Sequence, residues 1–195
     1  MDGIRRAVLL GGLAVGGACG AAAQQAVPPP PRPVESGPSL AVTMQFLQEK
    51  LNDIGKVTLI AFSQNTSDGS AVNNTYTDEV SYVIANPGEC RIDFHWKATN
   101  NGATTSDGGF WFSLRDVQDI VIKPYVQYQN EINASGGVPN IVTSSTNPNV
   151  TALLVRRPHG IYNFFPFTDA DLADRVAKAF THAVELCGGG NKEPF

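Results

Sequence analysis

Two stretches of the chain carry hydrophobic residues at helical spacing, one on each side of a long region with a different pattern. The first stretch contains Leu40, Met44, Leu47, Leu51 and Ile54. Residues three or four positions apart share one face of an α-helix, so this spacing predicts a helix with one buried face. Ser39 can cap its first turn, and Gly55 can end it in the left-handed conformation that glycine tolerates.

The second stretch predicts an amphipathic helix near the end of the chain, with one apolar side and one charged side. The apolar side consists of Leu172, Val176, Ala179, Phe180, Ala183 and Cys187. Thr168 and Asp171 match a capping box, in which two side chains satisfy the free backbone donors of the first turn. Such an apolar stripe needs a sheet to cover.

Between the two helices the hydrophobic period changes to two, which is typical of strands with one buried face. The pattern is clearest where Ile92, Phe94 and Trp96 alternate with polar residues. A similar series precedes it and consists of Tyr76, Val80, Tyr82 and Ile84, with Asp78 as the exception. The turn sequence Asn86-Pro87-Gly88 lies between the two runs, so together they predict a hairpin.

Further strands bring the predicted total to about seven. The candidates are Val57 to Ser63, Gly109 to Leu114, Asp119 to Tyr125, Val150 to Arg156 and Ile161 to Phe167. No helix long enough for a crossover separates them, so the strands should be mainly antiparallel. The predicted fold class is α+β, a small barrel or sandwich closed by the C-terminal helix, with an additional N-terminal helix.

The segment from Gln127 to Asn149 follows neither period and is mostly polar. A connection of this length without regular structure is uncommon inside a domain. Two interpretations stay open for it, a binding loop and a disordered segment.

The N-terminus predicts export. Arg5 and Arg6 precede a short apolar run rich in glycine and alanine, followed by small residues before Gln24. This layout is typical of a bacterial signal peptide, and the paired arginines also fit the twin-arginine route. We therefore expect a signal peptide over residues 1–23 and a secreted protein of the periplasm or cell envelope. Cys19 leaves a lipoprotein alternative, the one case in which membrane association is expected.

The rest of the chain divides by composition. Residues 24–38 are proline-rich and predict a linker, residues 39–187 are the size of one domain, and residues 188–195 predict a flexible glycine-rich tail. The formal charge of −4 becomes about −5 once Asp2, Arg5 and Arg6 leave with the signal peptide. A negative chain of this kind is a poor partner for nucleic acid or anionic lipid.

Two segments carry a resemblance to known proteins. Residues Phe112 to Ile120 look like the strand, short turn and strand found midway through pleckstrin-homology domains. Residues Asp174 to Gly190 are similar to the ending of exported bacterial proteins of unknown function. The resemblance implies a pleckstrin-homology-like (PH-like) domain over the folded part of the chain. Its first strand-to-strand loop, Gln64 to Ser70, has no basic residue, so phosphoinositide binding is not expected.

No residue pattern predicts a catalytic site, a cofactor or a metal site. His95, His159 and His182 lack the close spacing of zinc ligands, and we interpret them as solvated surface residues. The chain also lacks the Gly-x-Ser-x-Gly motif of many hydrolases.

Cys90 and Cys187 are the only cysteines that follow the predicted signal peptide. Cysteine pairs persist as disulfides in oxidising compartments, and both positions are expected to face the core. A disulfide is the favoured interpretation, and two separately buried thiols are the alternative.

The function that these features favour is a non-enzymatic binding or scaffolding module. We expect a protein or peptide partner in the cell envelope, bound in a groove beside the C-terminal helix where an extended peptide adds to a sheet edge. A small hydrolase and a carrier of an apolar ligand are the alternatives. A hydrolase predicts titratable groups clustered in a pocket, whereas a carrier predicts a cavity lined by residues such as Phe94, Phe112 and Phe164.

Overall fold

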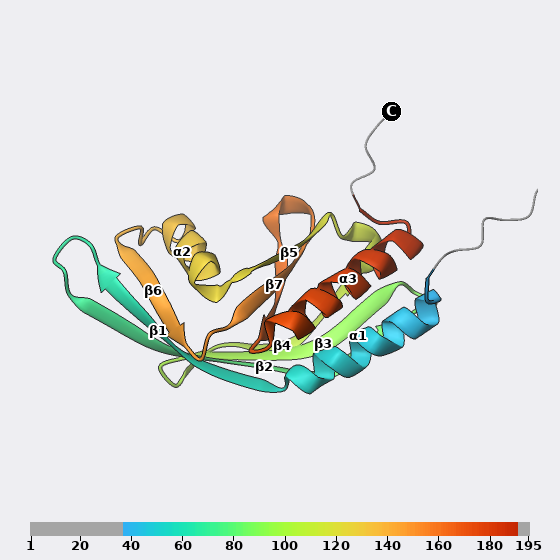
Figure 1. The fold of residues 1–195 in the computed structure, drawn as a ribbon, viewed down its shortest axis with the longest axis horizontal. Helices are drawn as coiled ribbons and strands as arrows, with labels where there is room; N and C mark the ends of the chain where they lie inside the picture. Colours follow the sequence, from blue (N-terminus) through green and yellow to red (C-terminus); the bar gives the residue numbers. More distant parts are fainter. Residues whose placement is uncertain (1–36, 191–195) are drawn as a thin grey trace, which may run out of the picture. The chain divides into compact units, whose positions relative to one another are not determined.

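A computed structural model describes residues 37–190 (Figure 1). The predicted signal peptide, Cys19 and most of the predicted linker lie outside the described residues. In chain order the elements are α1 (Leu40–Ile54), β1 (Lys56–Asn65), β2 (Ala71–Asn86), β3 (Arg91–Asn100), β4 (Ala103–Ser113), β5 (Asp119–Pro124), α2 (Tyr125–Ser135), β6 (Ile141–Asn147), β7 (Thr151–Arg156), β8 (Tyr162–Phe167) and α3 (Ala170–Leu186). The predicted α+β class and both terminal helices are confirmed.

The strands form two antiparallel sheets. One has five strands in the order β4-β3-β2-β1-β6, and the other has three in the order β5-β7-β8. The barrel interpretation is wrong, because β4 and β6 remain the two edges of the larger sheet and do not pair with each other. A short 3-10 turn at Leu114–Asp116 follows β4, and the chain then continues into β5, which pairs with β7.

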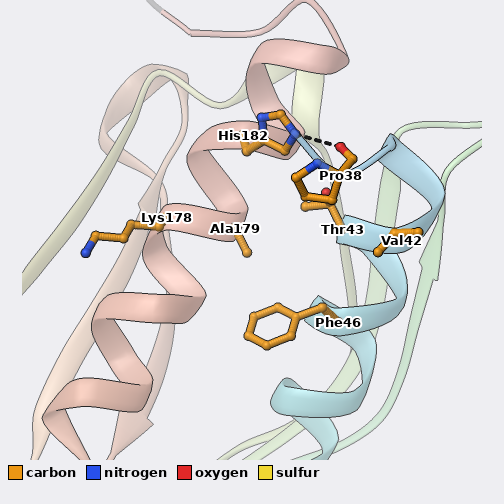
Figure 2. Close-up of a pocket in the computed structure, with 7 residues that line it drawn as sticks. All are labelled: Pro38, Val42, Thr43, Phe46, Lys178, Ala179 and His182. Carbon is orange, nitrogen blue, oxygen red and sulfur yellow. Dashed lines mark hydrogen bonds between the residues drawn. The ribbon is translucent and has the colours of Figure 1, made fainter. Parts of the chain in front are cut away.

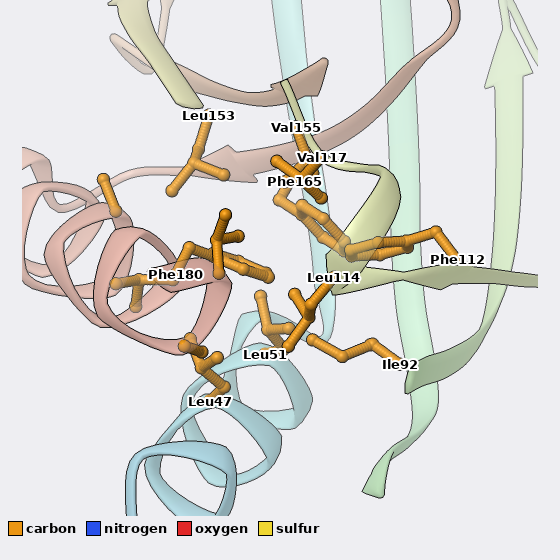
Figure 3. Close-up of a cluster of buried hydrophobic side chains, with 14 of the residues drawn as sticks. Leu47, Leu51, Ile92, Phe112, Leu114, Val117, Leu153, Val155, Phe165 and Phe180 are labelled. Carbon is orange, nitrogen blue, oxygen red and sulfur yellow. The ribbon is translucent and has the colours of Figure 1, made fainter. Parts of the chain in front are cut away.

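The central strand of the smaller sheet, β7, is buried on both faces. On one face, Leu153 and Val155 of β7 pack with the apolar stripes of α1 and α3 (Figure 3). On the other face, Ala152 and Leu154 pack against β1 and α2. All four side chains are at most 1% exposed. The five-stranded sheet has the simpler arrangement, with alternate residues of β1 buried and the others exposed.

A bulge in β2 changes which side chains face inward. The register shifts between Ser81 and Ile84, and Tyr82 adopts a positive φ of 52°. Val83 is therefore buried, whereas Tyr82 is 80% exposed. The prediction that Tyr82 and Ile84 continue the inward series of Val80 is wrong, because an extra residue in a strand moves the residues after it to the opposite face.

Helix α1 lies beside the second half of β2. The neighbouring strand β1 pairs with β2 only as far as Glu79, which leaves the remaining backbone of β2 without a strand on that side. Asn52 of α1 takes the place of the missing strand. Its Oδ1 accepts from Val83 N at 2.9 Å, and its Nδ2 donates to Val83 O at 3.0 Å. Gln48 Oε1 accepts from Ala85 N at 3.0 Å. The helix thus satisfies backbone groups that would otherwise form an open edge.

The segment from Gln127 to Asn149 is neither a disordered segment nor a long loop. It forms most of α2 and all of β6, so the structure has eight strands. The buried face of α2 consists of Tyr125, Gln129 and Asn133, four residues apart but largely polar. Asn133 Nδ2 donates to Ile141 O at 2.9 Å, which ties the helix to β6. A search for apolar spacing misses such a helix, because its inner face is held by hydrogen bonds.

Helix α3 carries the predicted apolar stripe but begins at a different residue. Its N-cap is Asp169, whose Oδ1 accepts from the backbone N of Asp171 at 2.9 Å and of Leu172 at 3.1 Å. The capping box of Thr168 and Asp171 is therefore wrong. A single aspartate one residue later satisfies both donors.

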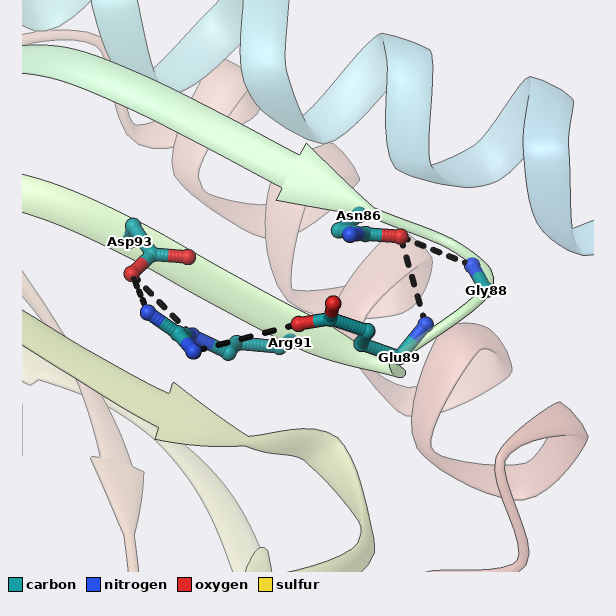
Figure 4. Close-up of polar contacts among 5 residues, drawn as sticks. All are labelled: Asn86, Gly88, Glu89, Arg91 and Asp93. Atoms are coloured by element: carbon teal, nitrogen blue, oxygen red, sulfur yellow. Dashed lines mark hydrogen bonds and ion pairs between the residues drawn. The ribbon is translucent and has the colours of Figure 1, made fainter.

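The far end of α3 is fixed to the β2–β3 hairpin. Asn86 Oδ1 accepts from the backbone N of Gly88 and Glu89, which shapes the predicted turn (Figure 4). Cys90 follows it, and the predicted disulfide to Cys187 is present, with the two Cα atoms 5.9 Å apart.

The glycines after α3 also pack closely against the domain. A Cβ on Gly189 would lie 2.3 Å from Leu114 O, so this close approach requires glycine. Gly190 N donates to Val117 O at 2.9 Å. The first residues of the predicted tail are therefore held against the domain.

Removing the disulfide should lower the free energy of unfolding substantially. The bridge joins residues 97 positions apart, and closing a loop of that length is worth about 4 to 5 kcal/mol in the chain-entropy model. We expect urea unfolding of the native protein to show a loss of this size when reductant is added.

The double variant Cys90→Ala/Cys187→Ala is the control, since reductant should leave its stability unchanged. Two alkylatable thiols in the unreduced, denatured native protein would contradict the assignment.

Candidate functional site

Helix α3 borders grooves on two sides. Between α1 and α3 lies a cavity of about 380 Å³ whose walls include Val42, Phe46 and Ala179 (Figure 2). His182 Nε2 contacts Pro38 O at 2.8 Å across one end. Both walls of this groove are helical, so it has no sheet edge to offer. It can receive an apolar side chain, but it cannot extend a sheet.

The opposite side of α3 faces β5. A cavity of about 410 Å³ lies between Ile120 and Ile122 of β5 and Thr181 and Glu185 of α3. A second cavity of about 280 Å³ shares Ile120, Thr181 and Glu185 with the first and extends to Gly190. The two form one groove along α3, which we call the β5 groove. It has the position that the sequence predicts for a peptide site.

A third cavity, of about 190 Å³, lies between the two sheets. Phe94 of β3 and Phe164 of β8 are in its wall, as the carrier alternative predicts. Phe112 is not, because it is fully buried in the core, where it packs against Phe180 at a ring-centroid distance of 6.2 Å. We call this cavity the aromatic pocket.

The histidines lie apart from one another. His95 is on the outward face of β3, where its Nε2 lies 3.2 Å from Asp107 Oδ1. His159 is in the turn between β7 and β8, and His182 is on α3. Within residues 37–190, no group of three or more histidine, cysteine or acidic side chains is arranged to hold a metal ion.

The most unusual titratable group is Asp78. It lies on the inner face of β2, is 6% exposed, and no ion pair within the described part of the chain includes it. Burial raises its pKa to about 6, although a hydrogen bond from Trp96 Nε1 at 3.3 Å opposes the shift. Burial, together with the charge of Asp78, raises the pKa of Tyr128 to about 12.

Sequence reasoning missed several residues of these sites. Asp78 was visible as the polar exception in an apolar series, and Asn163 as the one carboxamide between Ile161 and Phe167. Arg157 carried no such signal, since arginines next to a turn are ordinary surface residues. The cavities themselves require the packing of distant segments and have no local pattern.

No family model, no curated protein and no solved structure matches the chain. None of the helices between Gly37 and Gly190 has the length and apolar character of a membrane-spanning segment. The function therefore has to be inferred from the residues themselves.

Asp78 should make stability depend on pH. Its pKa is about 6 in the folded state against a usual 3.8. At a pH where Asp78 is ionised in both the folded and the unfolded state, its charge therefore lowers the free energy of unfolding by on the order of 3 kcal/mol. The folded state binds the proton more tightly, so the contribution of this group to stability falls as pH rises from about 4 to about 6.

The variant Asp78→Asn removes this effect. Its stability relative to the native protein should rise by on the order of 3 kcal/mol between pH 4 and pH 7 in urea unfolding. The exposed Asp116→Asn is the matched control for loss of a carboxylate. A difference between Asp78→Asn and the native protein that stays constant over this range would refute the assignment.

Proposed function

We propose that this protein is an exported, non-enzymatic binding module that takes an extended peptide along β5, beside α3. The observation that supports the proposal most strongly is that β5 has a strand neighbour on one side only, while a groove runs along it on the α3 side. An added strand would extend the sheet in the order peptide-β5-β7-β8.

The other sheet edges are less suitable for this role. The β6 edge contacts α2, where Asn130 Nδ2 donates to Thr143 O at 3.0 Å and Asn130 Oδ1 accepts from Thr143 N at 2.7 Å. The β8 edge is buried from Asn163 to Phe167. The β4 edge is open, but of its residues only Phe110 lines any of the four cavities described above.

The walls of the β5 groove define the peptide chemistry. Ile120 and Ile122 are two residues apart and therefore point to the same face of the strand. A bound strand with apolar residues at alternate positions would bury them there. Lys178 and Glu185 at the rim carry opposite charges, so no strong net charge is demanded of the peptide. Pro124 ends the strand and lacks a backbone donor, which limits pairing to the residues before it.

Export is supported by the disulfide as well as by the N-terminal sequence. A bridge between Cys90 and Cys187 persists in an oxidising compartment and is rare in the cytosol. In this proposal the PH-like domain acts in the periplasm or cell envelope.

Peptides selected from a random display library against the full chain test the proposal. Ile122→Glu places a charge in the groove and should weaken a selected peptide at least tenfold by calorimetry, on the basis of a lost apolar contact and a buried charge. Ile132→Glu on α2 is the matched control, since Ile132 is 43% exposed against 38% for Ile122 and lies outside the groove. Melting temperatures show that both variants fold.

Hydrogen exchange locates the binding. Bound peptide should slow exchange of those amides from Asp119 to Lys123 that point away from β7, because an added strand pairs with that side of the backbone. Protection confined to α1 or to the β7–β8 turn, or equal affinities of the two isoleucine variants, would count against the β5 groove.

A further inference from the structure

We propose that the aromatic pocket is a binding site for a small monocyclic aromatic carboxylate. The pocket is separate from the β5 groove and shares none of its residues. It opens where the β7–β8 turn approaches the inner face of β3 and β4. Three features of the pocket lead to this ligand class.

The first feature is the aromatic wall. Six rings contribute to it, from Phe94, Trp96, Phe110, Tyr128, Tyr162 and Phe164. Phe94 and Phe110 stack with centroids 5.9 Å apart, and Tyr128 and Phe164 stack at 5.0 Å. Aromatic rings bind another ring by offset stacking or edge-to-face contact, in addition to the apolar area that becomes buried.

The second feature is size. The pocket volume of about 190 Å³ is somewhat larger than a cavity of about 150 Å³ that is known to hold benzene in another protein. It is smaller than the range of about 300 to 1,000 Å³ typical of drug-sized ligands. One ring with one small substituent therefore matches the available space.

The third feature is a pair of unused hydrogen-bond donors. Asn163 lines the pocket and is only 7% exposed, yet its Nδ2 has no partner among the described residues. Arg157 also lines the pocket, and its buried Nε lacks a partner in the same part of the chain. Buried donors are normally paired, and these two belong to residues that line the same pocket, so an acceptor bound there has two unused donors in its immediate neighbourhood.

The charge of the wall selects an anion. Arg157 is the one charged residue that lines the pocket. The buried carboxylate of Asp78 does not line it but accepts from Trp96 Nε1 at 3.3 Å, so the charge that meets a ligand is that of Arg157. A carboxylate accepts hydrogen bonds through two oxygens and pairs well with a guanidinium group, whereas a neutral carbonyl has a single acceptor atom. The polar substituent of the ligand is therefore assigned as a carboxylate.

The mouth of the pocket is open to solvent and lies beside a positive charge. Ile161 and Tyr162 of the β7–β8 turn are 47% and 43% exposed at its border. The Arg156 guanidinium lies 5.4 Å from the Tyr162 ring centroid and its Nη2 contacts Tyr162 Oη at 3.3 Å, which holds the ring in place. A second positive charge thus stands beside the entrance.

Tryptophan fluorescence of the full chain can test the site. The chain has two tryptophans, and Trp111 is on the outward face of β4, so Trp111→Phe leaves Trp96 in the pocket wall as the reporter. Benzoate and phenylacetate should change its emission in a saturable way. Toluene carries the same ring without a charge, and benzylamine carries it with a positive charge.

Two substitutions separate binding from folding. Asn163→Leu removes an unpaired buried amide, so it should raise the melting temperature of the free protein while weakening both acids at least tenfold. Arg157→Gln should weaken them by a similar factor and leave toluene unaffected. Arg175→Gln, on the exposed side of α3, is the control for loss of a surface arginine and should leave binding of the acids unchanged.

Absence of saturable binding of either acid would overturn the proposal. So would acid binding that survives both pocket substitutions, or tighter binding of benzylamine than of the acids.

Discussion

Strand β7, at the centre of the three-stranded sheet, has buried apolar side chains on both faces, and the elements around it cover both of them. Leu153 and Val155 of β7 require the stripes of α1 and α3, while Ala152 and Leu154 require β1 and α2. A strand that is covered on both faces has an unbroken run of apolar residues in its sequence, as Ala152 to Val155 do. The disulfide and the packed glycines then fix the end of α3 over the covered face.

Polar side chains form hydrogen bonds with the free backbone groups at two sheet edges of this fold. Asn52 satisfies the N–H and C=O of Val83, and Asn130 does the same for Thr143, so a single carboxamide takes the place of a neighbouring strand in each case. An open edge is a template for pairing with another chain. Closing β2 and β6 in this way leaves β5, with the groove beside it, as the edge suited to a partner strand, which is the basis of the proposed function.

The sequence predicted those parts of the structure that depend on apolar periodicity. Both terminal helices and the strands around Ile92, Leu153 and Phe165 follow from it, and the disulfide followed from counting cysteines. The sequence did not predict α2 and β6, because Gln129 and Asn133 face inward and are held by hydrogen bonds. The bulge at Tyr82 is a further case, since it depends on how α1 packs beside β2. The aromatic pocket combines residues from three separate parts of the chain. The carrier alternative anticipated Phe94 and Phe164 in such a cavity, whereas of the polar residues Asn163 alone carried a local sign of it.

Hydrogen exchange of the ligand-free protein reports whether the covering of both faces of β7 organises the fold. The amides of Ala152 to Val155 should exchange only when the whole domain unfolds, so their opening free energy should equal the global value. The β5 amides that point away from β7 should exchange at a lower free energy, since that edge is open. Opening of the β7 amides well below the global free energy, while the β1 and β2 amides remain protected, would contradict this role of β7.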